Sequence, residues 1–345
     1  MSPDGNNEVD KSLMEDYAFY GYVRGLGDKY SAYTNAEEAK KMFAEQAGNF
    51  TGIGVLATQN QENGLIEILE VYANSPAMEA GIEPRDIIIE VDGTLVEEVG
   101  YDSAIDMILG EEGTSVTIKV DRNGTTLDFT MVRRVIDVKS VTYKMLDNNI
   151  GYIRIHDFND VTYDGFAEAM TELQKQAQDG ELSGVVFDLR NNLGGTLDSI
   201  VAVLDDILPE GDIVKLVNKS DEERVYKSDE REINIPMCVL VNGATASASE
   251  LFAGSLRDYD KAEIIGTTTY GKGCALGIFS LSDGSIIALV DEMYYTASGA
   301  NFEGKGLEPD YVVEMPDELL RYMFYLDENE DPQLRKAVEV LTGNE

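Results

Sequence analysis

Ser247 and Lys272 have the residue types and settings best suited to chemistry in this chain. Ser247 lies in the small-residue turn Thr245–Glu250, between the apolar run Met237–Val241, which predicts a strand, and a predicted helix. At such a turn backbone N–H groups lack partners and the helix dipole favours negative charge, which suits a nucleophile whose attack creates an oxyanion. Lys272 is flanked by glycines, so its backbone can approach another element closely. Taken alone, each pattern more often marks a helix cap or a solvated loop lysine, and their joint occurrence favours chemistry.

A glycine pair, Gly194-Gly195, is a second feature that suits catalysis. It follows the run Gly184–Arg190, which predicts a buried strand, and precedes a predicted helix. Paired glycines after a strand expose backbone N–H groups. A lone glycine pair is usually a tight turn and nothing more, so this pattern needs support from elsewhere in the chain.

That support comes from a resemblance to the carboxy-terminal processing peptidases, also called tail-specific proteases. Their signatures are a SASASE-type turn followed by T-[FY]-G-K-G, and D-L-R-N-N-x-G-G, and this sequence contains both. The resemblance covers nearly the whole chain. It implies that Ser247 is the nucleophile and Lys272 its general base. It also implies that the backbone N–H groups of Ala248 and of Gly194 or Gly195 bind the oxyanion.

The sequence departs from the family at Leu276, where the usual run is G-K-G-x-x-Q. The family's glutamine contacts and orients the lysine, whereas a leucine cannot hydrogen-bond Lys272, although it can help to desolvate it. Losing an orienting group can cost orders of magnitude in rate while leaving the nucleophile intact. Two functions therefore stay open: an active serine–lysine peptidase, or a weak or inactive homologue that acts as a peptide-binding scaffold or regulator.

Residues 50–135 predict a compact, mostly β unit that resembles a PDZ domain through the run SPAMEAGIEPRDIIIEVDG. The resemblance makes Gly52-Ile53-Gly54-Val55 the carboxylate-binding loop. In such a loop consecutive N–H groups capture the terminal carboxylate of a peptide, which adds to the sheet as a strand. Read without the resemblance, the loop is a glycine-containing start of a strand. We expect the partners to be the C-termini of peptides and proteins, bound through this domain.

Other catalytic chemistries have few candidate residues. His156 is the only histidine, and the alternation of its predicted strand favours a polar strand position over a catalytic base. Cys274 follows Lys272 closely, but we interpret it as a small apolar strand residue rather than a thiol nucleophile. With Cys238 it makes neither a zinc site nor a disulfide scaffold, so the sequence predicts no metal and no cofactor.

Composition excludes several classes of partner. The 345 residues carry a formal net charge of −38, which argues against nucleic acid and against an anionic membrane surface. No apolar stretch approaches the length of a transmembrane helix, and no signal-peptide pattern opens the chain, whose start looks trimmed. The resemblance implies an extracytoplasmic place in a bacterium, secreted or held at the membrane by an anchor that this sequence lacks.

The predicted fold class is multidomain α+β. We expect an N-terminal helical segment at residues 1–49, the PDZ domain at 50–135, an α/β peptidase core at 136–315 and a C-terminal helical segment at 316–345. The resemblance implies ClpP- or crotonase-like layering of the core, with the PDZ domain inserted. In the family the N- and C-terminal helices join, in some members forming a dimer, so we expect a homodimer through these helices.

Overall fold

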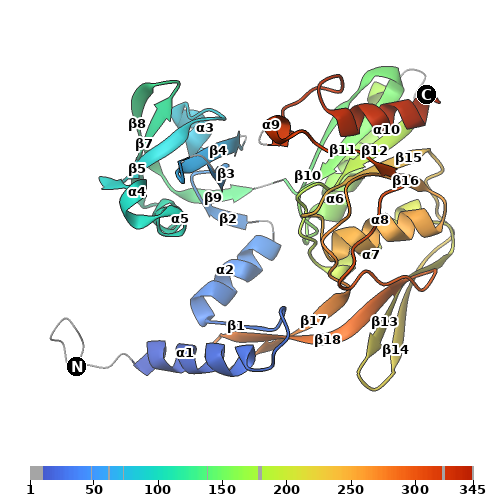
Figure 1. Cartoon of the computed structure of the whole chain (residues 1–345), viewed down its shortest axis with the longest axis horizontal. Coiled ribbons are helices and arrows are strands. Elements are labelled where there is room, and N and C mark those ends of the chain that lie inside the picture. Colours follow the sequence, from blue (N-terminus) through green and yellow to red (C-terminus); the bar gives the residue numbers. More distant parts are fainter. Residues whose placement is uncertain are drawn as a thin grey trace. The chain divides into compact units, whose positions relative to one another are not determined.

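The computed structural model describes residues 11–47, 49–60, 63–72, 74–137, 139–177, 181–320 and 323–343. The start of the chain, residues 1–10, lies outside the described residues. The chain divides into two compact units (Figure 1). The first comprises Met1–Phe43, Val141–Glu314 and Pro332–Glu345, and the second comprises Ala44–Ser140 and Met315–Asp331. The domain limits expected from the sequence stay a prediction.

A six-stranded sheet forms the centre of the first unit. Its order is β10 (Val141–Met145), β11 (Ile150–Ile155), β12 (Gly184–Asp188), β15 (Met237–Val241), β16 (Ala262–Gly266) and β19 (Tyr311–Val312). The strands from β11 to β19 run parallel, and β10, joined to β11 through the 3-10 turn Asp147–Asn149, is antiparallel. Every residue of β12 and β15 is buried, which explains why both strands read as continuous apolar runs.

Helices cover both faces of this sheet. Successive side chains of a strand point to opposite faces, and in the central strands the side chains on both faces are apolar and need covering. On one face, residues such as Phe187 and Val239 share a core with α6 (Thr162–Gln176), α7 (Leu197–Ile207) and α8 (Ala248–Asp258). On the other, Val186 and Leu240 pack with α10 (Pro332–Thr342). The sheet between two helical layers is the α/β core that the sequence predicts, and Figure 1 shows α7 and α8 side by side within it.

A second, antiparallel sheet of the first unit has the order β1 (Ala32–Thr34), β18 (Ile286–Thr296), β13 (Gly211–Asn218) and β14 (Glu223–Ser228). The strand β17 (Cys274–Ser280) also pairs with β18. The helices α1 (Lys11–Arg24) and α2 (Ala36–Gln46) flank β1. The sequence predicts only a helical segment there, but Tyr33 pairs with Ile287, so the N-terminal segment also contributes a strand to this unit.

The second unit is built on strands in the order β3 (Val55–Gln59), β4 (Ile66–Val71), β5 (Ile87–Val91), β7 (Ser115–Arg122) and β8 (Thr125–Val132). The strand β6 (Thr94–Leu95) pairs with β5, and β2 (Asn49–Gly52) with β9 (Arg134–Asp137). Its helices are α3 (Pro76–Ala80), α4 (Val96–Val99), α5 (Tyr101–Ile108) and α9 (Asp317–Leu320). Ser75 caps α3, and Asn123-Gly124, with positive φ at both residues, joins β7 to β8.

No helix in the described ranges has the length and apolar character that crossing a membrane requires.

Candidate active site and peptide groove

Three loops that follow β12, β15 and β16 bring the predicted catalytic residues to one edge of the central sheet. These strands are parallel, so the loops leave from the same, carboxyl edge, where open α/β sheets bind their ligands. Backbone hydrogen bonds join the loops in series. The Ala246 N–H donates to the Asn192 carbonyl at 3.0 Å, and the Tyr270 N–H donates to the Thr245 carbonyl at 2.9 Å. The Ser247 turn therefore lies between the glycine loop and the lysine loop.

Ser247 has an unusual backbone conformation, with φ of 57° and ψ of −119°. Among the described residues, ten other than glycine have positive φ, and eight of these are asparagine or aspartate. Those two types tolerate positive φ, whereas a serine in this region stores strain that surrounding structure must hold in place. The strain falls at the turn between β15 and α8, on a half-buried serine at the start of the helix.

The glycine loop lies directly against Ser247. A Cβ at Gly194 would lie 2.9 Å from the Ser247 Cβ and 3.0 Å from the Ala248 nitrogen, so only glycine leaves this space open. The Gly194 N–H already donates to Asn192 Oδ1 at 2.8 Å. The Gly194 carbonyl accepts a hydrogen bond from the Phe158 N–H. Because a trans peptide points its C=O and N–H in opposite directions, the Gly195 N–H faces away from Phe158. Within the described ranges no acceptor pairs with the N–H of Gly195 or Ala248.

Glu250 joins the serine and lysine loops, and the resemblance to the family did not point to it. Its carboxylate is fully buried and accepts four hydrogen bonds. Oε2 accepts from the backbone N–H groups of Ser247 (2.9 Å) and Lys272 (2.8 Å). Oε1 accepts from the Gly271 N–H (2.8 Å) and the Thr269 hydroxyl (2.5 Å). The spacing Ser-x-x-Glu before a helix is a capping-box signal, and it offered the means to find this residue.

Lys272 is half-buried, and its backbone is fixed more firmly than its side chain. The hydroxyl of Tyr294 hydrogen-bonds the Lys272 carbonyl and lies 3.0 Å from the Ser247 carbonyl. In the part of the chain that the structure describes, no hydrogen bond or ion pair involves Lys272 Nζ, and none joins it to Ser247 Oγ. Nζ lies over the aromatic ring of Tyr30, 5.3 Å from the ring centroid.

Leu276 lies in β17, where the register with β18 shifts between Ala275 and Leu276. The side chain is half-buried, and as a hydrocarbon it offers Lys272 no hydrogen bond. The effect of this departure from the family on Lys272 stays a prediction.

The other potential nucleophiles and bases are poorly placed for catalysis. Burial, with the nearby Arg154 cation, lowers the pKa of His156 to about 3, and its Nε2 lies 3.0 Å from the Thr142 hydroxyl. Burial raises the pKa of the Cys274 thiol and raises that of Cys238 to about 12, so neither favours the thiolate. These residues have the environments of structural side chains.

A buried ion pair lies on the α10 face of the sheet, and the sequence alone did not predict it. Arg190 donates to Asp188 through Nε and Nη2, and to Gln333 of α10 at 3.0 Å. The Tyr152 hydroxyl donates to Asp188 at 2.6 Å. Burial alone would raise the pKa of Asp188, but the Arg190 cation and these hydrogen bonds outweigh it and hold that pKa below its usual range.

The predicted carboxylate-binding loop lines a pocket of about 250 Å³ in the second unit. Gly52, Ile53, Gly54 and Val55 line it together with other residues of β3 and with Tyr101, Ile105 and Ile108 of α5. The pocket is largely apolar, and β3 is the outermost strand of its sheet. A peptide strand therefore has both an edge to pair with and apolar side chains to contact.

Hydrogen bonds orient the peptide planes of this loop. The carbonyls of Ile53 and Gly54 accept from the N–H groups of Ala77 and Tyr72, at 2.9 and 3.0 Å. Because a trans peptide points its C=O and N–H in opposite directions, the N–H groups of Gly54 and Val55 face the other way. Gly54 has φ of 81°, and a Cβ there would lie 2.3 Å from the Ser75 Cβ, so the α3 cap requires this glycine.

Comparisons with known proteins identify two families in this chain. Peptidase family S41 matches residues 149–313, and the PDZ domain family matches residues 67–122. The carboxy-terminal-processing protease of Bartonella bacilliformis is 36% identical over 89% of this chain and 71% of its own length. The carboxy-terminal processing protease CtpA of Bacillus subtilis is 34% identical over 92% of this chain and 67% of its own. The chain thus spans about two thirds of the length of these relatives.

A solved structure is similar over most of its length. The photosystem II D1 C-terminal processing protease superposes with a TM-score of 0.59 at 27% identity, covering 96% of this chain and 88% of that one. The observed sheets and this match confirm the predicted multidomain α+β fold class.

Proposed function

Because the chain belongs to the carboxy-terminal processing proteases of peptidase family S41, we propose that it is a serine endopeptidase with Ser247 as nucleophile and Lys272 as general base. Membership of the family supports the general assignment, a peptidase with a PDZ domain. The roles of individual residues rest on the sequence signatures and on the three loops that meet at one sheet edge.

The proposed reaction proceeds through an acyl-enzyme. Neutral Lys272 Nζ takes the proton of Ser247 Oγ as that oxygen attacks the scissile carbonyl carbon. The N–H groups of Ala248 and Gly195 bind the oxyanion that forms, and the Lys272 ammonium then protonates the leaving amine nitrogen. Neutral Lys272 then takes a proton from water as the water oxygen attacks the ester carbonyl carbon. The bond from that carbon to Ser247 Oγ breaks, the acid product leaves, and the Lys272 ammonium returns its proton to Oγ. This requires Nζ to come within hydrogen-bonding reach of Oγ.

One observation carries the proposal: the buried Glu250 carboxylate binds the backbone of both Ser247 and Lys272. A helix cap and a solvated loop lysine have no reason to share a buried carboxylate. The strained backbone of Ser247 and the space that Gly194 leaves beside it support the same interpretation.

We propose that the PDZ domain recruits substrates by their C-terminus, through the N–H groups of Gly54 and Val55. A carboxylate receives charge-assisted hydrogen bonds from such a loop. Amidating a bound peptide should therefore weaken its affinity about tenfold or more, measured by fluorescence anisotropy. Equal affinity of the amide and the acid would contradict carboxylate recognition.

A second candidate function, a catalytically weak or inactive scaffold, is favoured by one specific observation. Lys272 Nζ has no polar partner in the described ranges, and Leu276 cannot supply one. Such a protein needs only the peptide groove of its PDZ domain.

Cleavage of casein by purified protein separates the two candidates. The wild type should cut, and Ser247→Ala and Lys272→Ala should not. If the wild type does not cleave casein but Leu276→Gln does, the catalytic residues are intact and the leucine at position 276 prevents activity. Cleavage that persists in Ser247→Ala would overturn the dyad, and silence of every variant with intact peptide binding would favour the scaffold.

Two further proposals follow from the family. We propose that the protein acts outside the bacterial cytoplasm, which cell fractionation would test. We also propose a homodimer through the terminal helices, supported by the apolar side chains that α1 exposes: Leu13, Met14, Tyr17 and Tyr22 are 52–76% exposed. Sedimentation equilibrium should give a dimer for the wild type and a monomer for Tyr22→Asp.

A further inference from the structure

We propose that Tyr30, from the N-terminal segment, is a positioning residue for the Lys272 side chain. The proposal rests on the proposed role of Lys272 as general base. It assigns to the loop between α1 and β1 a part in the active site of the peptidase unit. Residue 30 and residue 272 both belong to the first unit, so the contact lies within one compact body.

Lys272 Nζ lies over the ring of Tyr30, with 5.3 Å between the nitrogen and the ring centroid. That distance is within the range in which an aromatic face attracts an ammonium group. The tyrosine is half-buried, and its hydroxyl lies 3.4 Å from the Gly271 carbonyl and 3.3 Å from Glu303 Oε1. The ring is thus attached to the same loop that carries the lysine.

Glu303 strengthens this attachment, because its second carboxylate oxygen binds the lysine loop on the C-terminal side of Lys272. Oε2 accepts from the Gly273 N–H at 2.8 Å, and the Asn301 side chain donates to the Gly273 carbonyl at 2.7 Å. One carboxylate therefore spans the Tyr30 hydroxyl and the residue after Lys272. The ring and the backbone of the lysine loop are thus attached to each other on both sides of Lys272.

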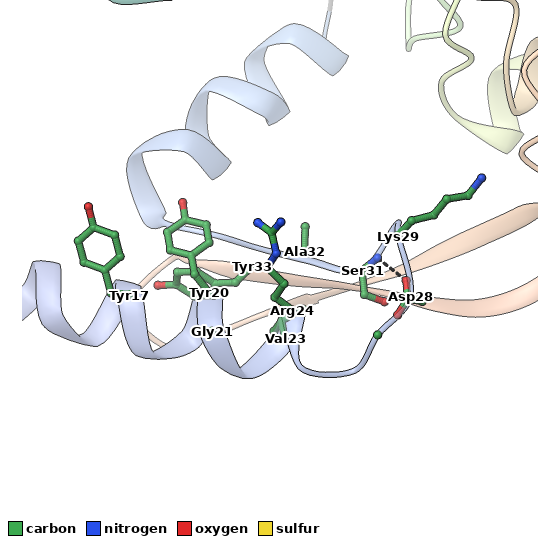
Figure 2. Close-up of a pocket in the computed structure, with 11 residues that line it drawn as sticks. Tyr17, Tyr20, Gly21, Val23, Arg24, Asp28, Lys29, Ser31, Ala32 and Tyr33 are labelled. Carbon is green, nitrogen blue, oxygen red and sulfur yellow. Dashed lines mark hydrogen bonds between the residues drawn. The ribbon is translucent and has the colours of Figure 1, made fainter.

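The loop that carries Tyr30 is itself closed by a local turn. Asp28 Oδ1 accepts from the N–H groups of Tyr30 (3.0 Å) and Ser31 (2.6 Å). Figure 2 shows the bond to Ser31, with the Lys29 side chain extending away from the tyrosines of α1. The Ser31 hydroxyl in turn accepts from the Val290 N–H at 3.2 Å, which ties the loop to β18.

Charged groups also lie near the ring. Lys29 Nζ lies 4.5 Å from the Tyr30 centroid and 5.3 Å from that of Tyr270. Glu303 is the carboxylate in contact, and Asp28 is engaged in the turn. Burial raises the pKa of the Tyr30 phenol, and it raises that of the Cys274 thiol, so both stay neutral at ordinary pH.

The ring has a defined effect on the reaction. An aromatic face stabilises an ammonium and not a neutral amine. Lys272 becomes an ammonium when it takes the serine proton, so the ring stabilises the product of that transfer while it holds the side chain in place. With leucine at position 276, Tyr30 takes the part of the orienting group.

The first test is the pH profile of kcat/KM for casein or a derived peptide. Tyr30→Leu should lower the limiting rate about threefold to tenfold and move the acid limb about half a unit to one unit toward lower pH, because the ammonium loses its support. Tyr30→Phe keeps the ring and should keep the acid limb in place. Tyr311→Leu, which removes the ring 4.9 Å from Lys336 Nζ, is the matched control and should leave both unchanged. A Tyr30→Leu profile identical to that of the wild type would overturn the proposal.

The second test does not depend on turnover. Acetylation of Lys272 by acetic anhydride, followed by mass spectrometry at a series of pH values, reports when the amine becomes neutral. Its midpoint should move to lower pH in Tyr30→Leu and stay in place in Tyr30→Phe and Tyr311→Leu. An unmoved midpoint in Tyr30→Leu would overturn the proposal. A wild type that cannot cut casein would contradict the proposed function alone, since the labelling midpoint still reports on the ring.

Discussion

Two fully buried carboxylates of the peptidase unit, Glu250 and Asp188, are held in contrasting ways. Asp188 is paired with the Arg190 guanidinium and the Tyr152 hydroxyl, so a positive charge balances it. Glu250 has no cation among its hydrogen-bond partners in the described ranges: three backbone N–H groups and the Thr269 hydroxyl donate to it. One carboxylate is half of an ion pair beneath α10, and the other organises loop backbone.

The contrast shows which buried carboxylate can be replaced. An ion pair can be exchanged as a unit for apolar side chains of similar volume, because both charges leave together. The donors around Glu250 are mostly backbone N–H groups, which no substitution removes, and leaving them unpaired in the interior is costly. Glu250 should therefore control activity, and Asp188 mainly stability.

The largest effect is expected for Glu250→Ala. Four buried donors lose their acceptor, and the Ser247 and Lys272 loops lose their shared anchor, so casein cleavage should fall about a thousandfold or more. Glu250→Gln is a matched variant of equal size that places an amide N–H against two of the donors. Its rate of casein cleavage should also fall, by about a hundredfold. A Gln variant with nearly wild-type kcat would contradict the organising role.

A smaller effect on activity is expected for Asp188→Asn, with a larger one on stability. The Arg190 guanidinium stays buried with a weaker partner, and the free energy of unfolding should fall by about 3 kcal/mol in urea titrations. The double variant Asp188→Leu/Arg190→Met should recover part of that loss. Equal destabilisation by the double and single variants would argue that the pair is not exchangeable.

The pH dependence of stability should sharpen the comparison, because His156 lies near the Asp188 network. The pKa of His156 is lowered from 6.5 to about 3, so between these values the unfolded chain binds a proton that the folded one does not. Stability is then lost as pH falls below 6.5, by about 2 kcal/mol at pH 5. His156→Gln should abolish this part of the loss in urea titrations at pH 7 and pH 5, and an unchanged difference would contradict the assignment.

The smallest effect is expected for Gln333→Ala on α10. It removes the hydrogen bond that Arg190 donates to Oε1 and the one that Nε2 donates to the Val313 carbonyl, so it should cost about 1.5 kcal/mol of unfolding free energy, with kcat unchanged. A clear drop in kcat would mean that the ion-pair region also shapes the catalytic loops.

The sequence predicts the elements of the site better than their connections. The turn around Ser247 and the glycine pair after β12 carry local signals, since strand, turn and helix are encoded in adjacent residues. The choice between the N–H groups of Gly194 and Gly195 depends on the Asn192 side chain, which only the folded loop reveals. The contact of Tyr30 with Lys272 joins residues far apart in the chain, and no periodicity encodes such a pairing.

The short strand β1 has a practical consequence. It pairs with the start of β18, Ala32 opposite Ala288 and Thr34 opposite Ile286. A recombinant fragment that begins after residue 43 would lack β1 and present an unpaired sheet edge to other chains. Unprotected edges of this kind promote self-association, so such a fragment should precipitate more readily than one that keeps the N-terminal segment.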